Sequence, residues 1–97
     1  MSTTAISAVV PRRPAMLAGQ VVAVAAQVRP WVRLNVELSD GTGTITLRFM
    51  GRAAIPGIRH GSRLHAQGTP WVEEGVLVMR NPLYEFTDEG HAWLHLG

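Results

Sequence analysis

The sequence predicts an all-β fold in which short strands curl around a small aliphatic core. Residues 34–39 and 44–50 alternate apolar and polar side chains on either side of an Asp40–Gly41–Thr42–Gly43 turn. This is one of the strongest short-range patterns for a β-hairpin. Apolar residues make up 46% of the 97-residue chain and aromatic residues only 6%, a balance expected where Val, Leu and Ala fill one small domain.

The segment before the hairpin is predicted to be an arm followed by one long strand. Residues 1–14 are rich in Ser, Thr and Ala and end in Pro11–Arg12–Arg13–Pro14, which is typical of a flexible N-terminal arm. Residues 15–28 are small or β-branched and predict a long bent strand, in which Gly19 marks a bulge or a sharp coil. Residues 29–32 form a short loop, since Pro30 disfavours continued pairing.

The segment after the hairpin is predicted to complete the sheet. Residues 51–61 contain Ile55–Pro56–Gly57–Ile58 and allow a turn or two of helix at most. Residues 62–72 predict a fourth strand, interrupted around residues 68–70, and residues 76–80 a fifth strand after a polar turn at 73–75. The domain therefore covers residues 15–86 and is followed by a C-terminal tail at 87–97.

Five strands, a long coiled first strand and a short helical or turn connector between strands 3 and 4 describe a five-stranded OB-fold Greek-key barrel. An SH3-like barrel is the structural alternative. Its strand lengths, and its lack of a connector before the fourth strand, agree less well with this sequence.

The hairpin register predicts one apolar and one polar face. If Ser39 pairs with Thr44, then Glu37 lies opposite Thr46, Asn35 opposite Arg48 and Arg33 opposite Met50. Ile45, Leu47 and Phe49 then share the core face. The opposite face displays Arg, Asn and Thr, which suits a surface that contacts a polar partner.

These residues carry a family resemblance. Residues 34–49, Ile55–Pro56–Gly57–Ile58, Gly61, Leu64, Gly68 and the closing Asn81–Pro82–Leu83–Tyr84–Glu85 together resemble OB-fold nucleic-acid-binding domains of the tRNA-anticodon type. The chain looks most similar to small stand-alone OB proteins of actinobacteria, and is similar over residues 15 to 86 to the wedge domain of the RecG branch-migration helicase. No helicase motor or synthetase catalytic domain accompanies it here, so the resemblance implies a binding surface and no reaction.

In such domains nucleic acid lies across the second and third strands and is flanked by two loops. The resemblance maps this surface onto residues 33–39, 44–50, 29–32 and 73–75. The candidate contacts are the Arg, Asn and Trp side chains on those elements and beside them: Arg29, Trp31, Arg33, Asn35, Arg48, Arg52 and Trp71. Arg neutralises phosphates and Trp stacks on bases, a combination that binds single strands with little sequence preference.

Each candidate also has a structural alternative. Trp31 either stacks on a base or folds back to cap the barrel, and Trp71 either contacts a base or packs. Arg33, Arg48 and Arg52 contact phosphate or form an ordinary solvated face in which Arg48 pairs with Glu37. Glu73 and Glu74 oppose a uniformly basic groove.

The charge balance is mild, with nine Lys+Arg, seven Asp+Glu and a formal net charge of +2. All nine basic residues are Arg, a bias that a GC-rich genome and a phosphate-binding surface both favour. Net charge alone does not identify a nucleic-acid binder. The mild charge instead supports the competing class, a protein-interaction or adaptor module that binds another protein or a second copy of itself.

Several chemistries are not expected. The chain has no Cys, no nucleophile with a partnered base and no phosphate-binding Gly loop followed by Lys, so we expect no enzymatic activity and no small-molecule substrate. His91 and His95 have an i, i+4 spacing but lack a suitable third ligand, so neither a metal nor another cofactor is expected. Without a signal peptide or an apolar run long enough to span a membrane, we expect a soluble cytoplasmic protein. The expected partner is single-stranded nucleic acid, DNA before RNA.

Overall fold

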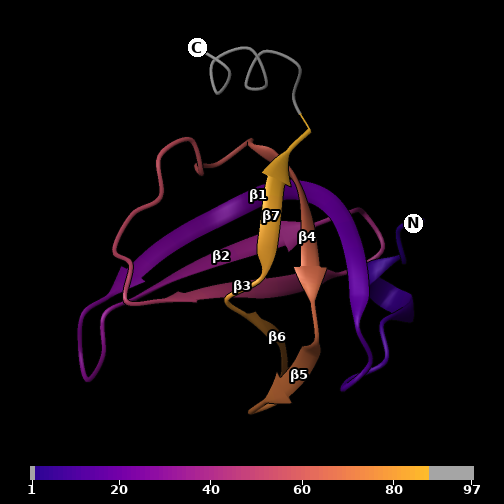
Figure 1. Ribbon diagram of the computed structural model, residues 1–97, viewed down its shortest axis with the longest axis horizontal. Helices are drawn as coiled ribbons and strands as arrows, with labels where there is room; N and C mark the ends of the chain where they lie inside the picture. The colour runs from indigo at the N-terminus through magenta and orange to yellow at the C-terminus, as the bar shows by residue number, and fades with distance from the viewer. Residues whose placement is uncertain (1, 88–97) are drawn as a thin grey trace.

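The computed structural model describes residues 2–87, which form one mixed β-sheet (Figure 1). A turn of 3-10 helix, η1 (Ile6–Ala8), precedes the strands, and no α-helix occurs within this range. The strands are β1 (Ala15–Gln27), β2 (Arg33–Ser39), β3 (Thr44–Met50), β4 (Arg63–Gly68), β5 (Pro70–Glu73), β6 (Val76–Arg80) and β7 (Leu83–Phe86). Their order in the sheet is β5-β6-β3-β2-β1-β4-β7.

The sheet curls because the chain joins two strands that lie far apart in this order. β4 pairs with β1 and β5 pairs with β6, yet Thr69 alone separates β4 from β5. Figure 1 shows β5 continuing from β4 toward β6. One residue advances the chain by less than 4 Å, so the two ends of the sheet must approach each other. β3 and β6 are parallel, and the other neighbouring strands are antiparallel.

The sheet has seven strands where five were expected. The expected fourth strand is divided into β4 and β5 at Thr69–Pro70, where the proline has no backbone N–H to donate to a ladder. The additional strand, β7, pairs antiparallel with β4 along the edge that β1 leaves free. In the strand order, β5 and β7 are the outermost strands of the sheet. The connector between β3 and β4 contains turns and bends and no helix.

The register predicted for the central hairpin is confirmed along its whole length. Ser39 pairs with Thr44, Glu37 with Thr46, Asn35 with Arg48 and Arg33 with Met50. The alternate residues on both strands are buried, as the pattern of polar and apolar side chains requires.

β1 is curved (Figure 1), and its bulge lies further along the chain than Gly19, where it was expected. The irregularity in pairing with β2 falls between Val21 and Ala23. Gly19 has a different role, because a Cβ there would lie 2.6 Å from the carbonyl oxygen of Ser39. Glycine is therefore required where β1 passes close to the end of β2.

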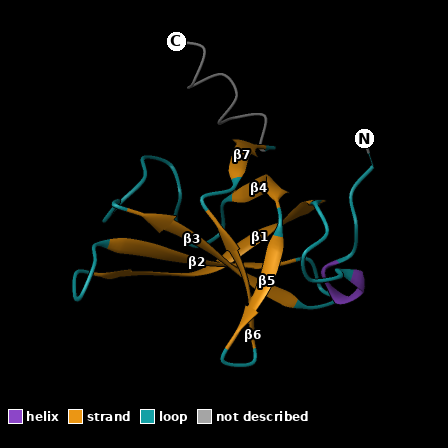
Figure 2. Ribbon diagram, turned by 60° about the horizontal axis from the view of Figure 1, so that its bottom comes forward, coloured by secondary structure: helices purple, strands orange, loops and turns teal. Residues whose placement is uncertain are grey.

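Among residues 2–87, fourteen buried apolar side chains fill the space inside the curl. Ile55 and Ile58 on the connector cover one end of this core, and Phe49 lies against Tyr84 edge to face with ring centroids 5.5 Å apart. Tyr84 contacts Phe86 in the same way at 6.0 Å. β7 therefore helps to close the domain. Figure 2 shows the connector and the β1–β2 loop at one end of the sheet and η1 at the other.

Residues 2–14 were expected to form a flexible arm, but they pack against the sheet. The Ile6 side chain belongs to the core and is 3% exposed. The N–H of Ile6 donates to Oδ2 of Asp40 at 2.8 Å, and the N–H of Arg12 donates to the carbonyl oxygen of Pro70 at 2.8 Å. One buried apolar side chain in a segment without a periodic pattern was too weak a signal to predict this packing. The tail predicted at residues 87–97, with His91, Trp93 and His95, lies outside the described residues from 88 onward.

Ile6→Ala tests whether the N-terminal segment contributes to the core. Loss of a fully buried Ile is expected to lower the free energy of unfolding by about 2–5 kcal/mol. Val10→Ala is the matched control, because Val10 lies in the same segment and is 51% exposed. Urea denaturation followed by circular dichroism measures both variants. Equal stability of Ile6→Ala and Val10→Ala would show that the segment is not part of the fold.

Candidate nucleic-acid interface

The candidate site is the outer face of β2 and β3, where polar side chains alternate with core residues. Leu34, Val36 and Leu38 point into the core, so Arg33, Asn35 and Glu37 face outward. Arg48 faces outward from β3 beside Asn35. The sheet therefore brings together three of the predicted contacts: Arg33, Asn35 and Arg48.

A chain of hydrogen bonds crosses this face from β1 to β6. Nδ2 of Asn35 donates to Oε1 of Gln27 on β1 at 3.0 Å, and Nε of Arg48 donates to Oδ1 of Asn35 at 2.9 Å. Nη1 of Arg48 donates to Oε2 of Glu73, and Nη2 of Arg80 donates to Oε1 of Glu73 at 2.5 Å. We call these five residues, Gln27, Asn35, Arg48, Glu73 and Arg80, the polar ladder.

Glu73 is the acidic centre of the polar ladder. Sequence reasoning considered Glu37 as the ion-pair partner of Arg48, but the partner is Glu73 on β5. Glu37 instead pairs across the hairpin with Thr46. Partial burial raises the pKa of Glu73, but hydrogen bonds from Arg48 and Arg80, together with their charges, outweigh it and leave that pKa below 4.5. Glu73 is therefore ionised at neutral pH and neutralises part of the basic face.

Trp71 lies on β5 with part of its ring exposed and with a cation over it. Its side chain is 41% exposed, and the guanidinium carbon of Arg12 lies 4.4 Å from the ring centroid. This cation–π contact joins the N-terminal segment to the edge strand. On the same face, Val78 lies between its strand partners Trp71 and Thr46 and is buried outside the main core. Trp71 therefore packs beside Val78 with one part of its ring and exposes the remainder to solvent.

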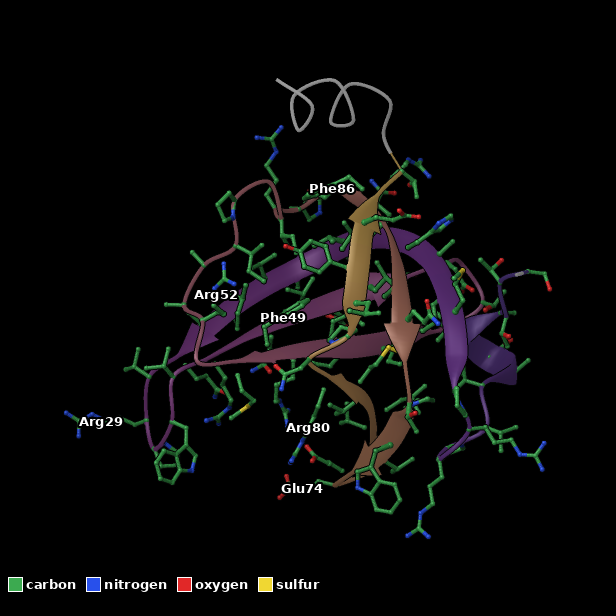
Figure 3. The ribbon with its side chains drawn as sticks, in the orientation of Figure 1. Arg29, Phe49, Arg52, Glu74, Arg80 and Phe86 are labelled. Atoms are coloured by element: carbon green, nitrogen blue, oxygen red, sulfur yellow. The ribbon has the colours of Figure 1, made fainter. Side chains whose placement is uncertain are left out.

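The β1–β2 loop projects beyond the sheet. Trp31 is 69% exposed, so it does not cap the core as one alternative had it. Nη1 of Arg33 donates to the carbonyl oxygen of Trp31 at 3.2 Å. The N–H of Gly51 donates to the carbonyl oxygen of Val32 at 2.7 Å. Figure 3 shows Arg29 extending outward from this loop. The loop thus presents an aromatic ring and a guanidinium to solvent at one end of the outer face.

Arg52 is the predicted contact that the fold separates from the others. It follows Gly51, whose φ of +79° turns the chain away from β3 and into the connector. In Figure 3, Arg52 lies on the same side of β3 as Phe49, while Arg80 lies on the opposite side. Phe49 is a core residue, so Arg52 belongs to the connector side of the domain.

Sequence reasoning missed three members of this face. Arg80 reaches it through the parallel pairing of β6 with β3, which joins segments 32 positions apart and leaves no local signal. Arg12 reaches it because the N-terminal segment is packed. Gln27 could have been found by extending the hairpin register across β1, since Gln27 pairs with Arg33.

Other candidate chemistries lie elsewhere or are not seen in residues 2–87. A shallow groove of about 250 Å³ lies beside β4 and β7, where Nδ1 of His65 is 3.4 Å from Oε1 of Glu85. In the described part of the chain, no three His, Asp or Glu side chains gather as a metal site would require. His91 and His95 lie outside that part. No helix between residues 2 and 87 has the length and apolarity to cross a membrane.

Comparison with known proteins shows a shared fold. No family model matches the sequence, and no curated protein matches it. A solved structure described as RecG bound to a three-way DNA junction matches with a TM-score of 0.76 at 15% identity. The match covers 94% of this chain and 13% of the RecG chain, so this chain spans a small part of that protein's length. The class established is an all-β domain with a fold found within RecG.

The lowered pKa of Glu73 predicts acid-dependent stability. A carboxylate with a depressed folded-state pKa stabilises the protein above its unfolded pKa, and this stabilisation is lost as pH falls through the folded value. The wild type should therefore have a higher Tm than Glu73→Gln at neutral pH. The difference should shrink from pH 4.5 downward. Thermal melts across this range measure it, and Glu74→Gln removes the same charge without removing the bridge. A difference that persists unchanged in acid would contradict the ion-pair assignment.

Proposed function

We propose that this protein binds single-stranded nucleic acid, DNA in the first place, across the outer face of β2 and β3 with little sequence preference. Arg33 and Arg48 contact phosphates, Asn35 supplies an adaptable hydrogen bond, and Trp31 stacks on a base. Arg29 adds positive charge at the loop, and Trp71 offers a second ring. Arg52 contributes from the connector side through long-range attraction.

The observation that carries this proposal is the exposed Trp31 beside the Arg-bearing face of the hairpin. An aromatic ring that is 69% exposed gains nothing from the core, whereas base–aromatic stacking gains about 1–3 kcal/mol per base. Its neighbours Arg29 and Arg33 are suited to phosphate contact because guanidinium groups donate in a planar fork. The likeness of the fold to RecG, whose solved structure contains a DNA junction, supports the same class of ligand.

We further propose that the domain is an OB-type barrel equivalent to the wedge domain of RecG. In this interpretation β4 and β5 are two halves of the fourth barrel strand, and β6 is the fifth strand. The single residue between β4 and β5 and the parallel pairing of β6 with β3 support it. The role is binding without catalysis or a cofactor, in the cytoplasm.

A fluorescence anisotropy titration with single-stranded DNA, single-stranded RNA and duplex DNA tests the proposal. Single strands should bind more tightly than duplex, and the logarithm of the binding constant should fall linearly with the logarithm of salt concentration. Absence of binding to any single strand at low salt would contradict the proposal.

Arg33→Glu is expected to weaken single-strand binding by about tenfold or more at low salt, because it replaces a phosphate contact with a repulsive charge. Arg59→Glu is the matched control. It makes the same charge change on the connector, away from the outer face of β2 and β3. Anisotropy titrations of both variants measure the dissociation constant for the single strand. They separate the effect of a charge at the interface from the effect of net charge. If the two variants lose the same affinity, Arg33 acts only through net charge.

Trp31→Ala is expected to cost about 1–3 kcal/mol of binding free energy through loss of one stacked base. Folding should be unaffected, because the ring lies outside the core. Val32→Ala is the neighbouring control within the same loop. Quenching of Trp fluorescence on titration with oligonucleotide provides a second measurement. Wild-type affinity in Trp31→Ala would exclude this ring from the interface.

One observation favours a second candidate function, self-association. Beyond Val21, the described part of the chain pairs β1 with β2 only, so one edge of residues 22–27 is open. This edge carries no charge or proline, and Val22 and Val24 are among its exposed side chains. Such edges pair with a second strand, and two copies can pair antiparallel about a two-fold axis. Light scattering coupled to size exclusion distinguishes a dimer from a monomer.

A further inference from the structure

Two arginines lie side by side on the outer face because β3 and β6 are neighbouring strands in the sheet. Arg48 and Arg80 are direct partners in the β3–β6 register. Like charges directly opposite each other destabilise a sheet unless an anion lies between them. The carboxylate of Glu73 supplies this anion, with Oε2 accepting from Arg48 and Oε1 accepting from Arg80.

We propose that the position of the Glu73 carboxylate between Arg48 and Arg80 is a phosphate site, and that Glu73 occupies it until a nucleic-acid backbone displaces it. The inference deepens the proposed function and rests on it. It adds Arg80 to the proposed phosphate contacts. It also makes the Glu73 carboxylate a competitor of phosphate for the two arginines.

The chemistry of the exchange is balanced. A backbone phosphodiester carries one negative charge and two non-bridging oxygens, as the carboxylate does. Each guanidinium can therefore keep one charged oxygen as its acceptor when phosphate replaces Glu73. An anion therefore lies between the two arginines both before and after the exchange.

Arg48 is held in place independently of Glu73. Nε of Arg48 donates to Oδ1 of Asn35, and Asn35 is itself held by Gln27. When Glu73 leaves, Arg48 therefore keeps its orientation. Arg80 has 63% of its side chain exposed and is accessible from solvent.

Glu73 is placed where a side chain can move away. It ends β5, an edge strand that pairs with β6 alone, and is followed by a turn in which Glu74 and Gly75 have positive φ. Figure 3 shows Glu74 and Arg80 on the same side of β3, at this end of the sheet. Displacement requires rotation of one side chain beside a turn and no change in the core.

The inference also explains how two acids beside the interface are compatible with binding. Glu73 and Glu74 appeared to oppose phosphate there. With Glu73 as a displaceable occupant, the affinity of the face is lowered but its geometry is preserved. Trp71, two residues earlier on the same face of β5, lies about 6.6 Å away along the strand, within reach of a base attached to the bound phosphate.

Glu73→Gln tests the inference, with Glu74→Gln as the matched control. Both variants remove one negative charge from the same turn, but Glu73 alone bridges the arginines. The probe is a labelled oligothymidylate of about 15 nucleotides, within the range of one small barrel. Titrations run from about 50 to about 200 mM salt. Thermal melts establish that each variant is folded.

We expect Glu73→Gln to bind about tenfold more tightly than the wild type at low salt, and Glu74→Gln to change affinity by about twofold or less. Because both arginines bind the same phosphate, freeing this site should also steepen the salt dependence of Glu73→Gln by about 0.7, the value for one phosphate contact on a single strand. Arg80→Gln in the otherwise native chain should weaken binding, and Arg63→Gln should do so less. If Glu73→Gln does not fold, the comparison of Arg80→Gln with Arg63→Gln tests the phosphate site instead. Equal affinity of these two variants would contradict the site.

The outcomes separate this inference from the function on which it rests. If the wild type binds and Glu73→Gln binds no more tightly than Glu74→Gln, the phosphate site is wrong and the proposed function stands. Weaker binding by Glu73→Gln means that Glu73 orients the arginines for binding. This result would also contradict the proposed phosphate site. If neither the wild type nor any variant binds, both proposals fail.

Discussion

The pairing register of β2 with β3 is the constraint on which the rest of the structure depends. A slip of one residue would turn Leu34, Val36 and Leu38 to solvent and bring Arg33 and Asn35 into the core. The Asp40 turn and the alternation of side chains both specify the observed register. Asp40 also accepts the N–H of Ile6 and so joins the N-terminal segment to the hairpin. Its pKa, which partial burial raises, is lowered overall by hydrogen bonds from Thr42, Ile6 and Gly43.

The outer face combines a basic hairpin with an acidic centre, and this combination shapes its electrostatics. Glu73 pairs with Arg48, while the side chain of Arg33, at the start of β2, donates to the carbonyl oxygen of Trp31 in the adjoining loop. The β1–β2 loop therefore presents positive charge beside an exposed ring, whereas Arg48 and Arg80 share one carboxylate. Under the proposed function, a nucleic-acid single strand that reaches this loop contacts Arg29, Trp31 and Arg33 before it reaches Arg48 and Arg80.

Prediction from sequence was most successful where contacts are local. The bounds of β3 and β6 and the complete β2–β3 register followed from alternation and turn chemistry. The packing of Ile6 did not, because its hydrogen-bond partner Asp40 lies 34 positions away and a single buried side chain leaves no periodic pattern. The division of the fourth strand at Pro70 was visible as an interruption. The pairing of β7 with β4 had no comparable signal.

The sequence by itself determined which side chains face outward on the hairpin, because the side-chain period of a strand is two residues and needs no knowledge of the remaining chain. Only the tertiary structure decided what those side chains meet. Arg48 finds Glu73 and Arg80, and not Glu37, because parallel pairing of β6 with β3 brings a distant hairpin against it. Arg52 leaves the face because the left-handed backbone of Gly51 turns the chain away. Non-local pairing is set by burial of the whole core, which no short window of sequence contains.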